Sequence, residues 1–459
     1  MPPRKLSARD LAVAVLREVL QRRGRATPLL AERGRGLSPA DHDLLRELVL
    51  GVLRWRDALD AEIASVSRVP LEKLAPKLRE ILEVALYQLR HLDRIPDYAA
   101  VSEAVSQARA SGGEGASRLV NGVLRGILLL PPPSPLPPGE GRGEDLLPLP
   151  PGEGRGEGVP TAQVLARHFS HPLFLVERWI QRFGLARTRA ILEADNAPSA
   201  LDLMANSRRG SREELAEALR AEGIQTEPSP LSPLGLTVHA GNPLRSPLFS
   251  AGLFTVQDVV SQALPLLLPQ GDTLVDLSAA PGGKSFSALL LGRARRSIAL
   301  DRSLPRLAML EENRARLGLP EVLPAAADVA APPLSAGRFD RVLYDAPCSG
   351  TGTLRKGPEI RYRITPDSIE RLASTQAAGL AAAAGLLSAG GYLLYATCSL
   401  EAEENEGVVA RVLSEDPRLE LALPEPPEAL AACVSNAVFR VFPDRRADGF
   451  TAHLLRRRA

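Results

Sequence analysis

The chain has 459 residues, of which 45% are hydrophobic and 24% are charged, and its net charge is only +2. This composition is typical of a globular protein with two or three domains, and the charge neither requires nor excludes a nucleic-acid partner. Three cysteines exclude a disulfide framework, so we expect a reducing, cytoplasmic environment. The uncharged stretch 374–400 is broken by Gly390-Gly391 into a helix and a strand, so we expect no membrane span.

The first 130 residues predict a run of amphipathic helices. Ser7 can cap one helix, and Ser38-Pro39 offers an N-cap followed by a first-turn proline. Apolar residues recur at helical spacing between 45 and 59 and again between 82 and 89. This segment has 21 Lys/Arg against 16 Asp/Glu, so it is the basic part of the chain. We expect an all-helical domain over residues 1–130.

A linker is predicted at residues 131–160. It contains ten prolines and seven glycines, and the sequence LPPGEGRGE occurs twice, at 136–144 and 149–157. Such a composition cannot form a packed core. We interpret it as a low-complexity insertion without chemistry of its own.

Two further domains are predicted after the linker. Residues 161–250 suggest a small α/β domain, with strands at 201–205 and 236–239 and a capping box at 211–214. From 251 to 459, short apolar runs alternate with helical segments. That alternation indicates a doubly wound, parallel sheet.

Glycine-rich and acidic loops follow the predicted strands of this sheet. Ser278–Lys284 (SAAPGGK) follows TLVDL, Asp301 follows SIAL and Asp328 follows PAAA. In doubly wound sheets, ligands bind outside the carboxyl ends of the strands, where glycines admit a ligand and a carboxylate takes ribose hydroxyls. A P-loop would need glycine in place of Ser278, and the dinucleotide fingerprint GxGxxG does not occur. A capping aspartate in a tight turn would explain any one of these positions, but not easily all three.

Two of the three cysteines also stand just beyond predicted strands. Cys348 follows the RVLYD strand within DAPCSGTG, and Cys398 follows GYLLYAT within ATCS. If these strands are neighbours, their ends lie roughly 5 Å apart and both thiols face one pocket. A lone cysteine is most simply a small buried hydrophobic residue, which accounts for Cys433 but not easily for the other two.

The motifs DLSAAPGGKS, LDRS, AADV, YDAPCSGTG and YATCSLEAEEN together resemble those of the RNA 5-methylcytosine methyltransferases that use S-adenosylmethionine. The chain is most similar to the RsmB/Sun type, which methylates a cytosine of small-subunit ribosomal RNA and carries a domain similar to the antitermination factor NusB. Residues 5–128 fit that domain, and HPLFLVERW, TVQD and ADGF extend the resemblance beyond it. The implied fold is an all-α NusB-like domain, a small α/β domain and a Rossmann-like methyltransferase domain.

The resemblance implies a role for each matching position. Cys398 would be the nucleophile, Cys348 would assist product release, and Asp345 would lie beside both the cofactor and the target base. Asp301 would hold the ribose hydroxyls of S-adenosylmethionine, and Asp328 would lie by its adenine. The loop lining the S-adenosylmethionine site would consist of Ser278, Ala279, Ala280, Pro281, Gly282, Gly283 and Lys284.

The implied chemistry explains these residue types. Carbon 5 of cytosine is a poor nucleophile, but addition of a thiolate to carbon 6 makes it enamine-like and reactive. A carboxyl group at Asp345 can hydrogen-bond or protonate the ring nitrogen as charge develops there. Ser278 stands where the family usually has cysteine, and Met204 stands where it commonly has arginine.

Charged residues flank the cysteine loops. The basic residues after DAPCSGTG predict phosphate contacts, with a solvated charged loop as the alternative. These candidates for RNA binding are Arg355, Lys356, Arg361 and Arg363. The acidic run 401–406 predicts the first turn of a helix, where the helix dipole favours negative charge.

Three other functions would use part of the same sequence features. A transfer-RNA methyltransferase could share every catalytic residue, but the NusB-like domain argues against it. A DNA cytosine methyltransferase would need only the Pro-Cys nucleophile of Cys348, and a non-enzymatic RNA-binding or antitermination protein would need only residues 1–130. We expect a cytoplasmic, monomeric methyltransferase for small-subunit ribosomal RNA, with no metal and no membrane partner.

Overall fold

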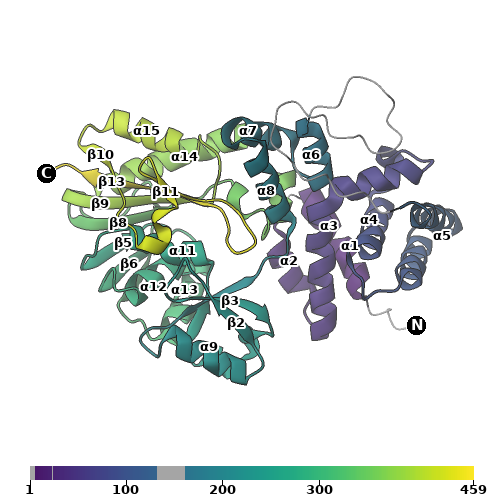
Figure 1. Ribbon diagram of the computed structural model, residues 1–459, viewed down its shortest axis with the longest axis horizontal. Helices are drawn as coiled ribbons and strands as arrows, with labels where there is room; N and C mark the ends of the chain where they lie inside the picture. The colour runs from purple at the N-terminus through teal and green to yellow at the C-terminus, as the bar shows by residue number, and fades with distance from the viewer. Residues whose placement is uncertain (1–5, 23, 132–160) are drawn as a thin grey trace. The chain divides into compact units, whose positions relative to one another are not determined.

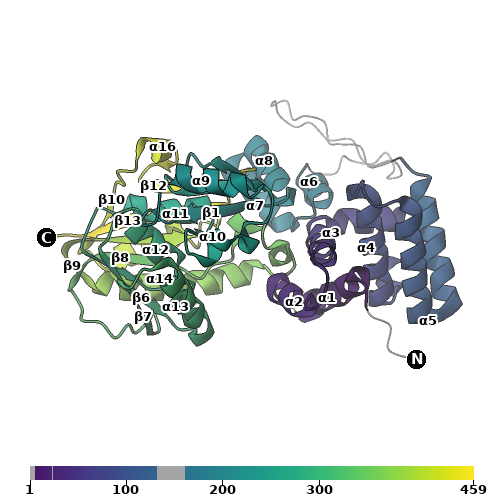
Figure 2. The same cartoon turned by 90° about the horizontal axis from the view of Figure 1, so that it is seen from below.

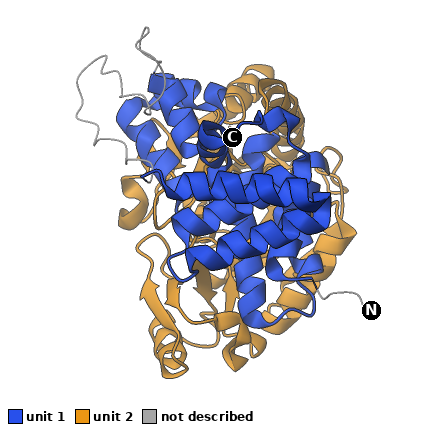
Figure 3. Cartoon of the chain, turned by 90° about the vertical axis from the view of Figure 1, so that its right-hand side faces the viewer, with its two compact units in different colours: residues 1–197, 354–363 blue, residues 198–353, 364–459 orange. Residues whose placement is uncertain are grey.

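The computed structural model describes residues 6–22, 24–131 and 161–459, so the predicted linker lies outside the described residues except for Pro131. The chain forms two compact units, coloured separately in Figure 3. Unit 1 comprises residues 1–197 and 354–363, and unit 2 comprises residues 198–353 and 364–459.

Unit 1 is all helical, as the periodicity predicts. The Ser38 side chain caps its third helix by accepting a hydrogen bond from the Asp41 amide, and Leu16, Leu45 and Leu53 are fully buried in the core. Long helices α4 and α5 lie side by side (Figures 1 and 2). The elements are α1 (Ala8–Arg22), α2 (Ala26–Arg33), α3 (Pro39–Val66), η1 (Leu71–Lys73), α4 (Pro76–His91), α5 (Asp97–Leu128), α6 (Thr161–Phe169), α7 (Leu173–Phe183) and α8 (Leu185–Asn196).

A segment from the middle of the chain completes unit 1. Leu354–Arg363 follows the DAPCSGTG loop and contains the 3-10 helix η5 (Pro358–Tyr362). Tyr362 packs against the helical core, and its hydroxyl donates to the carbonyl of Leu53 at 2.8 Å. The chain therefore leaves unit 2 directly after a cysteine loop, contributes to the helical core of unit 1, and returns to unit 2.

The two units do not follow the predicted domain boundaries. Helices α6–α8 were expected within the small α/β domain, but they belong to unit 1, where α6 packs against α3. The strand β4 (Phe254–Val256) lies beyond the predicted boundary at residue 250, yet it pairs with β1 (Leu201–Ala205). Both differences arise because long-range packing, rather than the local pattern, decides which neighbours an amphipathic element finds.

Unit 2 contains a small antiparallel sheet of order β2-β3-β1-β4, as expected for the α/β part. The capping box forms: Ser211 accepts from the Glu214 amide, and the Glu214 carboxylate accepts from the Ser211 amide. Besides β1 and β4, its elements are α9 (Arg212–Ala221), β2 (Gln225–Pro228), β3 (Gly235–Ala240), η2 (Pro243–Arg245) and α10 (Pro247–Ser250).

The large sheet of unit 2 has nine strands in the order β11-β12-β13-β9-β8-β5-β6-β7, with β10 paired to β13. Strands β5 to β9 are parallel neighbours, which confirms the doubly wound prediction, whereas the C-terminal strands β10 to β13 add antiparallel pairs that were not predicted. From β5 the chain proceeds to β6 and β7 on one side and then returns to β8 on the other. The strand order therefore reverses between β5 and β8, where doubly wound sheets bind ligands.

Helices cover both faces of this sheet (Figure 1). Helices α11, α12 and α13 pack on one face and α14 and α15 on the other, with a separate apolar cluster under each layer. Helix α14 ends at Gly385 and β9 begins at Leu387, so the predicted break in the uncharged stretch precedes Gly390, which lies within the strand. In the described part of the chain, no helix is long and apolar enough to cross a membrane.

The remaining bounds complete the description of unit 2. The strands are β5 (Thr273–Asp276), β6 (Arg296–Asp301), β7 (Val322–Ala326), β8 (Phe339–Asp345), β9 (Leu387–Thr397), β10 (Leu419–Ala422), β11 (Val434–Ser435), β12 (Val438–Val441) and β13 (Phe450–Arg457). The helices are α11 (Val259–Ala263), η3 (Leu264–Leu267), α12 (Gly283–Leu290), α13 (Leu304–Leu317), η4 (Thr351–Thr353), α14 (Pro366–Gly385), α15 (Glu406–Glu415) and α16 (Glu428–Ala431).

Candidate active site

The candidate site lies at the carboxyl ends of β5, β6, β8 and β9. A cavity of about 180 Å³ opens there, bordered by the loop after β5 and by Asp345 at the end of β8. Its lining consists of Thr255, Val256, Gln257, Ser261, Ser278, Ala279, Ala280, Pro281, Gly283, Lys284, Phe286, Arg306, Asn313 and Asp345. The structure thus brings most of the predicted SAAPGGK loop together with Asp345.

Two positions of the loop after β5 require glycine, because a Cβ there would be too close to neighbouring side chains. Gly282 has φ 111°, and a Cβ placed there would lie 2.2 Å from the Phe286 ring. A Cβ on Gly283 would lie 3.0 Å from the Gln257 amide. Bare backbone therefore faces the cavity at the start of α12, as ligand approach requires.

A buried carboxylate beneath the loop fixes its shape. Asp276 ends β5, is fully buried, and accepts a hydrogen bond of 2.8 Å from the Ser285 hydroxyl. Burial raises the pKa of Asp276 to about 6. Neither residue was predicted as part of the site, because the motif does not reveal that Ser285 turns back toward the preceding strand.

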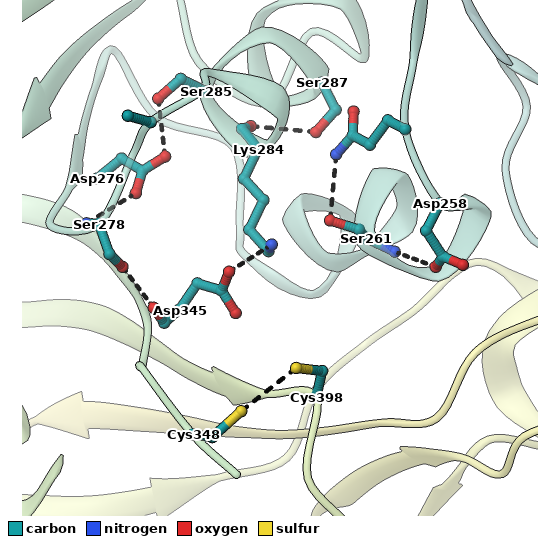
Figure 4. Close-up of polar contacts among 12 residues, drawn as sticks. Asp258, Ser261, Asp276, Ser278, Lys284, Ser285, Ser287, Asp345, Cys348 and Cys398 are labelled. Carbon is teal, nitrogen blue, oxygen red and sulfur yellow. Dashed lines mark hydrogen bonds and ion pairs between the residues drawn. The ribbon is translucent and has the colours of Figure 1, made fainter. Parts of the chain in front are cut away.

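Lys284 and Asp345 form an ion pair across the cavity (Figure 4). Their Nζ and Oδ2 atoms are 2.6 Å apart, and 13% of the Lys284 side chain and 28% of the Asp345 side chain are exposed. Burial alone would lower the pKa of Lys284, but the carboxylate of Asp345 raises it above its ordinary value. The Ser278 hydroxyl donates to the Asp345 carbonyl, so the ends of β5 and β8 are joined. The site therefore holds a permanent cation next to a carboxylate acceptor.

The two predicted cysteines do meet. Strands β8 and β9 are parallel neighbours, with Asp345 paired to Ala396, and the Sγ atoms of Cys348 and Cys398 are 3.3 Å apart (Figure 4). The hydrogen bond with Cys398, burial and the nearby negative groups raise the pKa of Cys348 well above its ordinary value. The sulfur–sulfur contact joins Cys348 and Cys398, whereas Cys433 lies between α16 and β11 and packs against the apolar cluster beneath α11 to α13.

Glycine is also required within the DAPCSGTG loop. A Cβ on Gly352 would lie 2.3 Å from the carbonyl oxygen of Gly449, whose amide donates to the Gly352 carbonyl at 2.7 Å. The Gly352 amide in turn donates to the carbonyl of Cys398 at 2.9 Å. The backbone itself therefore locks the two cysteine loops and the ADGF segment together.

Asp301 ends β6 and Asp328 follows the end of the neighbouring strand β7, but the two carboxylates differ in burial. Asp301 is 4% exposed, accepts from the amides of Ala280 at 3.2 Å and Ser303 at 2.9 Å, and pairs with Arg306 at 3.2 Å. Asp328 is exposed and accepts from the Ala330 amide at 2.9 Å. Asp301 therefore supports the loop after β5 through the Ala280 amide, and neither Asp301 nor Asp328 is itself among the residues that line the cavity.

The predicted phosphate contacts need a correction. Arg361 is 3% exposed and donates to the carbonyls of Arg54, Phe169 and Ser170 through Nη1 and of Asp195 through Nη2, at 2.8–3.3 Å. Burial lowers the pKa of Arg361 to about 10.

Arg355 is likewise only 1% exposed, and its carbonyl accepts from Arg54 at 3.2 Å. Both arginines are interior residues of unit 1. Arg361, in η5, donates to carbonyls at the ends of α6 and α8 and to that of Arg54 within α3. Lys356 and Arg363 are half-buried in the same segment. Burial therefore argues against RNA contacts by Arg355 and Arg361, whereas phosphate contacts by Lys356 and Arg363 stay a prediction.

Several lining residues were not singled out from the sequence. Gln257 belongs to the TVQD motif, and its amide donates to the Ser261 hydroxyl at 3.3 Å. Arg306 and Asn313 lie on α13, which follows the strand ending in Asp301. Arg306 lies in the first turn of the helix that follows the Asp301 strand, and this position is the sequence signal that could have identified it as a lining residue. Among the residues that the structure describes, no cluster of His, Cys, Asp or Glu could hold a metal ion.

The fold and the site define an S-adenosylmethionine-dependent methyltransferase. The parallel sheet with its switch point, the glycine-containing loop after β5 and the acid at the end of β6 fit a nucleoside with a charged amino-acid arm. The chain matches the family described as 16S rRNA methyltransferase RsmB/F at residues 263–456, the NusB family at 6–128, and the RsmF/B ferredoxin-like domain at 171–245.

Relatives match over nearly the whole chain. It is 35% identical to the "Probable ribosomal RNA small subunit methyltransferase B" of Synechocystis sp., over 97% of this chain and 98% of that protein. It is 31% identical to the Bacillus subtilis protein of the same description, with the same shares covered. The chain therefore belongs to the RsmB type of the RsmB/F methyltransferase family.

Solved structures share the fold. The crystal structure of PH0851 superposes with a TM-score of 0.75 at 24% identity, over 98% of this chain and 99% of that one. NSun6 from Pyrococcus horikoshii, crystallised with the S-adenosylmethionine analogue SFG, gives a TM-score of 0.54 at 24% identity, over 61% of this chain and 97% of that one.

Proposed function

We propose that this enzyme transfers a methyl group from S-adenosylmethionine to carbon 5 of a cytosine in 16S ribosomal RNA, through a covalent bond between Cys398 and carbon 6. The observation that carries the proposal is the pair of sulfur atoms 3.3 Å apart beside the Lys284–Asp345 ion pair. A methyltransferase acting on oxygen or nitrogen would have no use for two thiols at this position.

Cys398 supplies the nucleophile. Its thiolate adds to carbon 6 of the cytosine, and the electron pair of the 5,6 double bond becomes available at carbon 5. S-adenosylmethionine supplies an electrophilic methyl group when bound. Once carbon 5 carries the methyl group, its proton must leave to a base, and the electrons of that C–H bond re-form the double bond and expel the Cys398 thiolate.

Asp345 and Cys348 serve the steps on either side of methyl transfer. The ring nitrogen beside the exocyclic amine takes a proton from water as Cys398 adds, and the Asp345 carboxylate accepts a hydrogen bond from the resulting N–H. The raised pKa of Cys348 keeps it a thiol, 3.3 Å from the Cys398 sulfur. The Cys348 S–H donates to that sulfur as its bond to carbon 6 breaks, which assists release of the product.

The residues that would bind the cofactor lie in the loop after β5 and at the ends of the next two strands. Ser278 to Lys284 line the methionine end of S-adenosylmethionine, Asp301 holds its ribose hydroxyls, and Asp328 lies by its adenine. The lining of the cavity by most of that loop and the contact between Asp301 and the Ala280 amide support this assignment.

The substrate is the ribosomal RNA of the small subunit, which places the reaction in the cytoplasm. The relatives' descriptions and the NusB match support an RNA substrate. The expected position is cytosine 967 of 16S ribosomal RNA. This base must be unstacked from its RNA to reach the thiols. Bisulfite sequencing of 16S ribosomal RNA and of transfer RNA, with and without the gene, identifies the RNA and the position.

The thiols provide the decisive test. Cys398→Ala should abolish methyl transfer and form no covalent adduct with the RNA. Cys348→Ala should still attack, release product slowly and accumulate an adduct that survives denaturing gel electrophoresis. Cys433→Ala is the matched control and should keep full activity, since the sulfur–sulfur contact joins Cys348 and Cys398.

Two other outcomes would contradict the proposed roles of the thiols. If the adduct is lost in Cys348→Ala and kept in Cys398→Ala, the thiols have exchanged roles, as in a DNA-type mechanism. If both variants stay fully active, neither thiol is catalytic and the proposed mechanism is wrong.

A further inference from the structure

One buried carboxylate joins the two cysteine loops. Glu404 lies in the acidic run 401–406, which was expected to be the first turn of a helix, but α15 begins only at Glu406 and Glu404 is fully buried. Its Oε1 accepts from the Ser349 amide at 2.8 Å, and its Oε2 accepts from the hydroxyls of Ser349 and Ser399. Ser349 follows Cys348 directly, and Ser399 follows Cys398 directly. The carboxylate thus touches the neighbour of each thiol.

A second side chain extends this contact to the other side of Cys348. Gln376, fully buried on α14, donates through Nε2 to Glu404 Oε1 and to the Pro347 carbonyl, both at 2.9 Å. Both peptide neighbours of Cys348 are therefore tied to Glu404, one directly and one through Gln376. A carboxylate with four donors around it satisfies its buried charge.

The carboxylate also lies among other polar groups. The Ser399 hydroxyl is 3.1 Å from that of Ser349 and accepts from the Glu401 amide at 3.0 Å. The Tyr395 hydroxyl, from β9, donates to the Glu404 carbonyl. None of these groups lines the cavity, so this cluster is separate from the cofactor-binding residues.

We propose that Glu404 is a positioning residue that holds Cys348 and Cys398 at the separation required for attack and release. The inference rests on the proposed function, because it assigns both thiols to the reaction. The two loops come from different strand ends, so their sulfurs stay 3.3 Å apart only if something fastens the loops. Backbone contact through Gly352 fastens them on one side, and Glu404 fastens the residues next to the sulfurs themselves.

Charge and position can be separated by substitution. In Glu404→Gln, the amide oxygen can accept from the Ser349 amide and from Gln376, while the amide nitrogen donates to the two serine hydroxyls, which rotate to accept. Glu404→Gln therefore keeps the hydrogen bonds that position the two loops and removes the negative charge. Glu404→Ala removes both the hydrogen bonds and the charge. Glu415→Gln, at an exposed position of α15 paired with Arg411, is the matched control.

Three measurements test the proposal on the full-length enzyme. Glu404→Ala should lower kcat about 100-fold, because a displacement of about 1 Å costs that much, while the dissociation constant for S-adenosylmethionine changes less than about twofold. Glu404→Gln should keep kcat within about tenfold of the parent.

Diamide, which takes up the two hydrogens as the thiols form a disulfide, should link Cys348 to Cys398 at least about tenfold more slowly in Glu404→Ala.

The pH dependence of alkylation adds an independent reading. Cys398, Glu404 and Asp345 all raise the pKa of Cys348, and Tyr344, Tyr395 and Lys284 are the other titratable groups around the pair. Removing the charge in Glu404→Gln should therefore shift iodoacetamide labelling of the Cys348 peptide to lower pH. Glu415→Gln should leave the profile unchanged.

Two results would overturn the proposal. One is parental kcat and parental disulfide rate in Glu404→Ala; the other is a kcat in Glu404→Gln as low as that in Glu404→Ala. If Glu404→Ala does not fold, the double variant Ser349→Ala with Ser399→Ala, which removes only the Oε2 donors, should show a smaller loss of the same kind. Activity retained in Cys398→Ala would refute the proposed function. It would not decide this inference, because the rate at which diamide links the two thiols is measured without RNA.

Discussion

Charged side chains are buried in both units, but they do different things there. In unit 1, Arg79 pairs with Asp60 and with Glu83 at 3.1 Å, and Arg56 pairs with Glu83 at 3.0 Å. These side chains bond to one another between α3 and α4 and border no cavity lined by the site residues. In unit 2, the ion pair of Lys284 and Asp345 borders a cavity at the open ends of the strands.

The comparison shows that a perturbed charge does not by itself identify an active site. Burial raises the pKa of Glu83, inside unit 1, to about 8, which is further from its ordinary value than that of Asp276 beneath the cofactor loop. What distinguishes unit 2 is that its polar atoms converge on accessible space with two thiols nearby. The following experiments are expected to separate the two kinds of buried charge.

Asp345→Asn should have the largest effect on function. The amide keeps the shape of the side chain but loses the charge that pairs with Lys284 and accepts from the ring, so methyl transfer should fall about 1,000-fold. The rate is measured with tritiated S-adenosylmethionine and 16S ribosomal RNA. Asp340→Asn, half-exposed on the same strand, is the control and should be active. Activity within tenfold of the parent would contradict this assignment of Asp345.

Arg361→Ala should have the largest effect on stability. It leaves four backbone carbonyls of unit 1 without their charged donor, at a cost of about 3 kcal/mol or more. Urea unfolding measures the loss, and Arg371→Ala, exposed on α14, is the control. If Arg361 instead contacted phosphates, the variant would keep its stability and bind RNA with a shallower salt dependence.

Asp301→Ala should weaken the binding of S-adenosylmethionine. The ribose hydroxyls lose their acceptor and the Ala280 amide loses its support, which together cost roughly 1–3 kcal/mol, or about 5-fold to 150-fold in affinity. Isothermal titration calorimetry measures the change. Glu311→Ala, on the exposed side of α13, should bind as the parent does. Unchanged affinity in Asp301→Ala would remove Asp301 from the proposed site.

Glu80→Gln should have the smallest effect, and its size should depend on pH. Glu80 is 3% exposed in unit 1, its Oε2 has no hydrogen-bond partner, and burial raises its pKa from 4.5 to about 7. The folded state therefore binds this proton more tightly than the unfolded state, so stability is fully present below the unfolded pKa and is lost as pH rises through about 7.

The amide of Glu80→Gln does not titrate, so the variant does not lose stability in this way as the pH rises. We expect the difference in free energy of unfolding between Glu80→Gln and the parent to favour the variant by about 1–2 kcal/mol more at pH 8 than at pH 5. Urea unfolding of both proteins at the two pH values measures it. An identical difference at both pH values would show that the Glu80 carboxyl does not titrate between them.

Local patterns predicted most of the fold and much of the site. The cap at Ser38, the capping box at Ser211 and the strand–loop–helix order depend on residues only a few positions apart, so the sequence reveals them directly. The meeting of Cys348 and Cys398 was also predictable, because consecutive parallel strands are usually neighbours in the sheet.

The sequence alone thus determined the helical N-terminal part, the doubly wound sheet and the motifs at its strand ends. Only the tertiary structure decided where the charged residues of the loops are placed. Arg361 bonds to the carbonyl of Arg54, 307 residues away, and Glu404 faces serines in two different loops. The same residue types in sequence would suit a solvated loop or a helix start. Burying a charge depends on partners that only the folded chain assembles, because each such charge needs donors or acceptors from several distant segments.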